Sequence, residues 1–136
     1  MDGDDGIVWF LRAARQDLGS VIILAIEGRV SNATAPDLAG WLAAIKGRPL
    51  RGVVIDLSGV DYINGTGLRL LAAAATELAA ANAELVVCGL RPGLQTIFDM
   101  AAPLPDVTIE RSADAASRRL LRPDEPGPHR GSRPTG

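Results

Sequence analysis

The sequence predicts an α/β fold built on a mixed β-sheet of four to five strands. Two observations predict this class. Short runs rich in β-branched residues alternate with segments whose apolar residues recur at helical spacing, which indicates strands joined by right-handed helical crossovers. The first two runs are separated only by a short turn around Asp17, Leu18 and Gly19, so these two strands are expected to pair antiparallel.

The strands are predicted from short apolar segments that turn residues bound on both sides. They are residues 7–12, 21–27, 51–57, 84–88 and 106–110. The third contains Val53, Val54 and Ile55 in succession, and such a run is typical of a strand covered on both faces.

The first helix is predicted to begin at Thr34, with Asp37 three residues later as a variant of the capping box. Pro36 is tolerated in the first turn of this helix. Gly47 and Pro49 are expected to end it.

Three further helices are predicted. An Ala-rich segment of high helix propensity runs from about residue 66 to 81. The next helix covers about residues 92–101, with an apolar stripe expected to face the core. Ser112 is expected to cap the last helix, which reaches about Leu121.

One domain is predicted over residues 7–121, because a chain of 136 residues suits a single modest core. Residues 1–6 are expected to form a flexible N-terminus, and residues 122–136 a disordered tail rich in Pro and Gly. A net charge of −2 gives no broad electrostatic surface for nucleic acid. No apolar segment approaches the roughly 20 residues that span a bilayer, and the acidic N-terminus is unlike a secretory signal. We therefore expect a cytoplasmic protein with no direct membrane insertion.

Residue types that support catalysis or metal binding are scarce. His129 is the sole histidine and falls in the predicted tail, while Cys88 is the only cysteine and falls in an apolar strand. Neither a histidine triad nor a His/Cys metal site can therefore assemble in the domain. The chain also has no Gly-Lys-Ser or Gly-Lys-Thr motif and no full dinucleotide glycine pattern. We expect no enzymatic activity, no catalytic residue, no cofactor and no metal.

A small polar turn, Tyr62 to Leu68, is expected between the third strand and the helix that follows. It places the Thr66 hydroxyl where unpaired backbone N–H groups collect and anions are favoured. From the residues alone, the simplest interpretation is that this hydroxyl caps the helix, which stabilises by about 1 kcal/mol. The glycines are expected to supply backbone freedom, and Gly67 to let a partner approach closely.

Three segments together resemble a known family in order and spacing, over roughly residues 20 to 110. They are residues 27–35, residues 64–68, and residues 85–90 with 94–100. The first resembles a Gly-Glu-Leu-Asp turn, the second an Asp-Ser-Ser-Gly-Leu motif, and the third a strand with its following helix. These are features of the STAS domain, most closely of bacterial anti-sigma factor antagonists. The resemblance implies a STAS-like sheet with helices packed mainly on one face.

The resemblance also implies a regulatory function. Thr66 takes the position of the phospho-acceptor. The partner-binding residues that it implies are Ser31, Asn32, Thr34, Asn64, Gly65, Gly67, Leu68 and Arg69. By resemblance, the unphosphorylated form binds an anti-sigma factor that is also a serine/threonine kinase and thereby frees a sigma factor. Phosphorylation ends that binding, and a cognate phosphatase restores it.

Two other functions remain open at this stage. The chain is also similar to the small STAS subunits that bind constitutively to lipid-transporting ABC complexes, and a role as a ligand sensor is a third possibility. Several positions depart from the antagonist pattern: Asn64 replaces Asp, Gly65 replaces Ser, Arg29 replaces Glu and Ser31 replaces Asp. These changes are expected to make the pocket around the phospho-acceptor more positive, and Arg69, one turn onward, could hold a phosphate.

Overall fold

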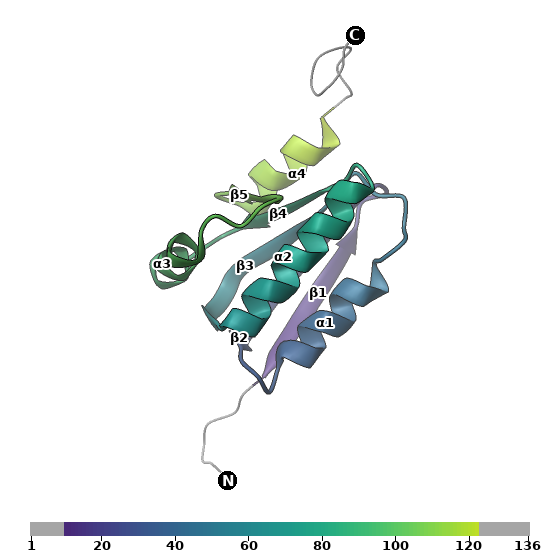
Figure 1. Ribbon diagram of the computed structural model, residues 1–136. Coiled ribbons are helices and arrows are strands. Elements are labelled where there is room, and N and C mark those ends of the chain that lie inside the picture. Colours follow the sequence, from purple (N-terminus) through teal and green to yellow (C-terminus); the bar gives the residue numbers. More distant parts are fainter. Residues whose placement is uncertain (1–9, 123–136) are drawn as a thin grey trace.

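The structure is a computed structural model that describes residues 10–122 (Figure 1). Within these residues it contains five strands and four helices. In chain order they are β1 (Leu11–Asp17), β2 (Val21–Val30), α1 (Ala35–Ala44), β3 (Gly52–Ile63), α2 (Gly65–Ala80), β4 (Glu84–Cys88), α3 (Pro92–Ala101), β5 (Val107–Glu110) and α4 (Ala113–Leu121). The strand order across the sheet is β1-β2-β3-β4-β5. β1 pairs antiparallel with β2 and all other pairs are parallel, which confirms the predicted mixed α/β sheet.

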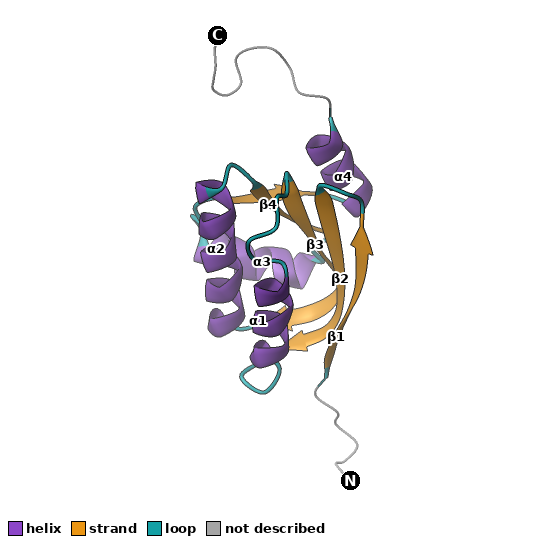
Figure 2. Ribbon diagram, turned by 90° about the vertical axis from the view of Figure 1, so that its right-hand side faces the viewer, coloured by secondary structure: helices purple, strands orange, loops and turns teal. Residues whose placement is uncertain are grey.

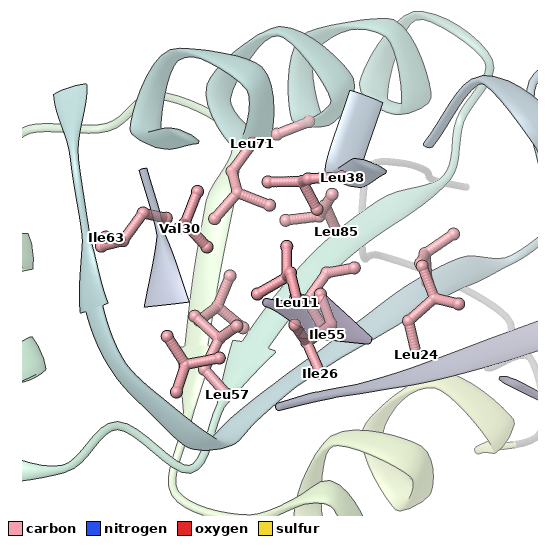
Figure 3. Close-up of a cluster of buried hydrophobic side chains, with 14 of the residues drawn as sticks. Leu11, Leu24, Ile26, Val30, Leu38, Ile55, Leu57, Ile63, Leu71 and Leu85 are labelled. Atoms are coloured by element: carbon pink, nitrogen blue, oxygen red, sulfur yellow. The ribbon is translucent and has the colours of Figure 1, made fainter. Parts of the chain in front are cut away.

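The helices lie mainly on one face of the sheet, as predicted. Figure 2 shows α1, α2 and α3 on one side and α4 on the other. The main core lies under the first three helices, and the close-up in Figure 3 shows side chains of the sheet meeting Leu38 of α1 and Leu71 of α2. A smaller core on the opposite face joins Ala116 and Leu120 of α4 to the strands. Successive strand residues point to opposite faces, so a run such as Val53, Val54 and Ile55 supplies both cores.

The predicted end of the third strand is wrong. β3 continues from residue 57 to Ile63 because its second half keeps pairing with β2, from Glu27 opposite Gly59 to Val30 opposite Ile63. Val60 and Ile63 are fully buried there. The polar turn therefore begins only at Asn64, directly before α2.

The first strand also differs from the prediction. β1 spans Leu11–Asp17 because the whole segment pairs with β2 across the predicted turn. The C-terminal half of β1 was not predicted because its residues are mostly polar and exposed, so they form no apolar run. The predicted start at residues 7–9, the predicted flexible segment 1–6 and residues 123–136 of the predicted tail lie outside the described residues.

α4 is attached to the sheet edge by a cluster around Glu84. Arg119 donates to both carboxylate oxygens of Glu84, with distances of 3.1 Å (Nε to Oε1) and 2.6 Å (Nη2 to Oε2), and Thr108 donates to Oε2 at 3.0 Å. Desolvation by burial raises the pKa of Glu84, but these hydrogen bonds and the charges of Arg119 and Arg122 outweigh it, and the net pKa is lowered. The ionised form of Glu84 is therefore more stable in the folded protein than in the unfolded chain.

We predict that Glu84→Gln lowers the free energy of unfolding by roughly 1 kcal/mol near neutral pH, and that the loss shrinks in acid. Since the folded-state pKa lies below the unfolded value, the stabilisation is present above the unfolded pKa and is lost as the pH falls through the folded pKa. Urea unfolding of both proteins at neutral pH and below pH 4 measures the difference.

The matched control is Asp114→Asn, which removes the exposed Asp114–Arg118 pair of the same helix. Its effect should be smaller than that of Glu84→Gln at neutral pH. An equal loss for Glu84→Gln at both pH values would contradict the pKa argument.

Candidate functional site

The candidate site forms where β2 and β3 end side by side. Because these strands are parallel, their C-terminal ends meet at one edge of the sheet, and Val30 pairs with Ile63 as the last residue pair. The amide of Asn64 then donates to the carbonyl of Val30 at 3.0 Å. The loop after β2 and the first turn of α2 are thereby brought together. We call this region, formed by Ser31, Asn32, Asn64, Gly65, Thr66 and Arg69, the Thr66 surface.

Asn64 is the residue that caps α2. Its side-chain Oδ1 accepts a hydrogen bond from the backbone N–H of Gly67 at 2.9 Å, and its Nδ2 donates to Oδ1 of Asn32 at 2.9 Å. The interpretation of Thr66 as the cap is therefore wrong. The signal was present in the sequence, since Asn is among the best N-cap residues and stands three positions before Gly67.

Thr66 is the second residue of α2, and its side chain is partly exposed. Since Asn64 supplies the cap, the Thr66 hydroxyl is not needed for one. Its Oγ1 instead accepts a long hydrogen bond of 3.3 Å from Nη2 of Arg69. Thr66 therefore presents a hydroxyl at the mouth of a helix N-terminus, where a phosphate is electrostatically favoured.

Thr34 does not lie on the surface. Its residue exposure is only 3%, and its Oγ1 accepts from the Ser31 amide at 2.9 Å while donating to the Arg29 carbonyl at 2.7 Å. The predicted capping box with Asp37 is absent, because the Asp37 amide bonds to the Thr34 carbonyl instead. Thr34 thus shapes the loop from inside, and the expectation that it contacts a partner directly does not fit its burial.

Gly67 is also buried, against the expectation that it lets a partner approach. A Cβ at this position would lie 2.5 Å from Cγ1 of Val30 and 2.7 Å from Cγ1 of Ile63. Glycine is required here because the helix packs directly on the ends of the two strands. Leu68 is half-buried against the main core, so it offers a partner only part of its side chain.

The remaining partner-binding candidates lie on the loop after β2 and on the first turn of α2. Ser31 and Asn64 are partly exposed, and Asn32, Gly65 and Arg69 are exposed. No described contact shows what they bind, so their roles stay predictions.

Arg29 does not act on Thr66 in the expected way. It precedes the buried Val30, so its side chain lies on the sheet face opposite α2. There its guanidinium lies 5.2 Å from the ring centroid of Tyr62, and its Nε is 3.7 Å from Oδ1 of Asp61. Sequence reasoning missed this contact because the predicted strand ended at residue 57, before Asp61 and Tyr62. Arg69 is the cation that contacts the Thr66 hydroxyl.

Metal-ligating side chains and the Cys88 thiol are the groups that bear on possible chemistry in the described part of the chain. No group of three or more His, Cys, Asp or Glu side chains among residues 10–122 is arranged to hold a metal ion. Burial raises the pKa of the Cys88 thiol to about 12, with Asp56 and Glu110 adding to the shift. The thiol is thus protonated and buried, which makes it a poor nucleophile.

Two further observations concern a membrane or a ligand. Among the described helices, none combines the length and apolarity that crossing a membrane requires. A hollow of about 500 Å³ lies between the C-terminal ends of α1 and α2, at the far end of α2 from Thr66. Leu42, Leu50 and Leu78 line it together with Lys46 and Glu77. The sequence did not indicate this hollow, because its lining comes from two segments, residues 42–50 and 74–83, that are distant in the sequence.

Comparison with known proteins identifies the class of this domain. The model of the STAS domain family matches residues 12–116, which is more than three quarters of the chain. The chain therefore belongs to the STAS domain family.

Within that family the chain is similar to anti-sigma factor antagonists. It is 31% identical over 107 residues to BtrV of Bordetella bronchiseptica, which bears the provisional name of an anti-sigma factor antagonist; the match covers 79% of this chain and 92% of BtrV. An anti-sigma factor antagonist from Mycobacterium paratuberculosis superposes with a TM-score of 0.74 at 22% identity, over 82% of this chain and 94% of that one. The antagonist SpoIIAA in its unphosphorylated form gives 0.67 at 12% identity, over 80% and 96%.

We predict that Gly67→Ala destabilises the protein by roughly 1–3 kcal/mol, because the added methyl group overpacks Val30 and Ile63. The matched control is Gly40→Ala in α1, where the added Cβ meets nothing within 4 Å and better helix propensity should stabilise by up to about 1 kcal/mol. Thermal and urea unfolding measure both. Equal stability of the two variants would contradict the direct packing of α2 on the strand ends.

Proposed function

We propose that this chain is an anti-sigma factor antagonist that acts in the cytoplasm and is switched by phosphorylation of Thr66. In its unphosphorylated form it binds a kinase-type anti-sigma factor through the Thr66 surface, which frees a sigma factor. The kinase transfers a phosphate to Thr66 and binding ends. A phosphatase removes the phosphate and restores the binding form.

The observation that best supports this proposal is that Asn64, and not Thr66, caps α2. Asn64 caps α2 with its side-chain oxygen, so the helix does not depend on the Thr66 hydroxyl. A kinase can therefore modify Thr66 without removing the cap. In a turn capped by the threonine itself, the same modification would cost the helix its first side-chain hydrogen bond.

The shape of the surface favours contact with a protein. Asn32, Ala33 and Gly65 are exposed and small, so a partner can approach the backbone of both segments closely. A phosphate would add a charge of about −1.5 to −2 to the Thr66 surface. A partner that packs there would have to desolvate that charge, which is why phosphorylation should end binding.

The relatives support the same function. BtrV and the proteins of the two structural matches are named as anti-sigma factor antagonists. SpoIIAA of Bacillus has been solved in a phosphorylated form as well, with a TM-score of 0.60 to this chain over 79% of its length. The fold is thus compatible with both states of such a switch.

We predict that incubation with the cognate kinase and ATP adds one phosphate to the wild type and none to Thr66→Ala. The matched control is Thr76→Ala, an exposed threonine farther along α2, which should be phosphorylated like the wild type. Intact-mass spectrometry measures the incorporation. Phosphorylation should weaken binding to the kinase-type anti-sigma factor by about 10- to 100-fold, measured by calorimetry.

Phosphate gain by Thr66→Ala, or unchanged binding after modification of Thr66, would overturn the switch. A pull-down from the native organism tests the choice of partner. Recovery of a small soluble kinase supports the proposal, whereas recovery of an ATPase with a permease would favour a transport-complex subunit instead.

A further inference from the structure

We propose that Arg69 is the built-in counter-ion of the switch. It pairs with a carboxylate of the partner when Thr66 is unmodified, and it pairs with the phosphate when Thr66 is phosphorylated. This inference rests on the proposed function and specifies both the chemistry of the partner and the way that phosphorylation breaks the contact.

The position of the Arg69 guanidinium is the first argument. The side chain folds back over the first turn of α2, with Nη2 at 3.3 Å from Oγ1 of Thr66 and Nη1 at 3.4 Å from the Cβ position of Gly65. A Cβ at residue 65 would only make ordinary van der Waals contact with Nη1, so the guanidinium packs closely over the backbone of Gly65.

The second argument is that Arg69 has no competing carboxylate in the described part of the chain. The arginines that do lie within 4.0 Å of a described carboxylate are Arg12, Arg15, Arg29, Arg48, Arg118 and Arg119. The contact of Arg69 is the neutral hydroxyl of Thr66. Asp61, which is near in sequence, contacts Arg29 on the other side of the sheet.

The strengths of the possible contacts explain the switch. A hydrogen bond of 3.3 Å to a neutral hydroxyl is long and weak, so a partner carboxylate can draw the guanidinium away from Thr66. A phosphate on the same oxygen offers charge-assisted and bidentate hydrogen bonds, which are roughly twice as strong as neutral ones. Phosphorylation would therefore both add negative charge and withdraw the cation that the partner uses. The local charge would change from about +1 to about −1.

The first test measures the phosphate itself and needs no kinase. Phosphothreonine is encoded at position 66 of the full chain, and its second pKa is followed by ³¹P NMR. A nearby cation stabilises the dianion, so Arg69→Ala should raise this pKa by about 0.3–0.5 of a unit, the size expected for an exposed ion pair. Arg69→Lys should keep part of the effect. In 1 M salt the difference should largely vanish.

The matched control is Arg118→Ala, which removes another exposed helical arginine from α4, on the other face of the sheet (Figure 2). It should leave the phosphate pKa unchanged. The same pKa in the wild type and in Arg69→Ala would overturn the role of Arg69 as counter-ion.

The second test measures the partner contact. In the unphosphorylated protein, Arg69→Ala should weaken binding to the anti-sigma factor about 3- to 10-fold, with a smaller dependence on salt than the wild type shows. Unchanged affinity and salt dependence would overturn the assignment of a partner carboxylate.

The two tests separate this inference from the proposed function. If phosphothreonine at position 66 abolishes binding but Arg69→Ala does not change the phosphate pKa, the phosphorylation switch is supported and the role of Arg69 as counter-ion is excluded. If the pKa responds to Arg69 but the phosphate leaves binding intact, the proposed function fails and the inference fails with it.

Discussion

The parallel pairing of β2 with β3, continued to Val30 and Ile63, is the constraint on which the site depends. It makes both strands end at the same edge of the sheet, and Gly67 then packs α2 directly on the last residue of each. With any side chain at position 67, either α2 or the side chains of Val30 and Ile63 would have to shift. The helix start, the loop after β2 and the Thr66 hydroxyl are therefore positioned by one buried contact beneath the surface that they form.

A second consequence follows from how the hydrogen bonds at this edge are shared. The buried Thr34 hydroxyl bonds to the backbone of the loop after β2. Asn64 caps α2 and also bonds to Asn32 of that loop. These bonds are internal to the two segments and leave Thr66 outside the bonding that holds the turn together. The Asn at position 64 has a property that an Asp would lack, since its amide donates to Asn32 while its oxygen caps the helix. The departure from the family motif thus joins the two segments.

The sequence was sufficient for the parts of the fold that depend on periodicity. β4 and α3 match their predicted limits, and Ser112 caps α4 as expected, because short apolar runs and local caps are properties of adjacent residues. It was insufficient where pairing across the sheet decides the structure. The second half of β3 is regular only because β2 runs beside it. In the same way, Thr34 is buried where it bonds to the Arg29 carbonyl, and Gly67 is buried against Val30 and Ile63. The periodicity of the sequence does not indicate these contacts.

The charge departures illustrate the same limit and correct their interpretation. Counted along the sequence, Arg29 and Asn64 both make the motif region more positive. In space they act differently, because the Arg29 side chain contacts Asp61 and Tyr62. The cation that contacts Thr66 comes instead from one turn farther along α2 and reaches it over Gly65. The guanidinium thus packs over Gly65 at van der Waals distance and reaches the Thr66 hydroxyl from the same helix.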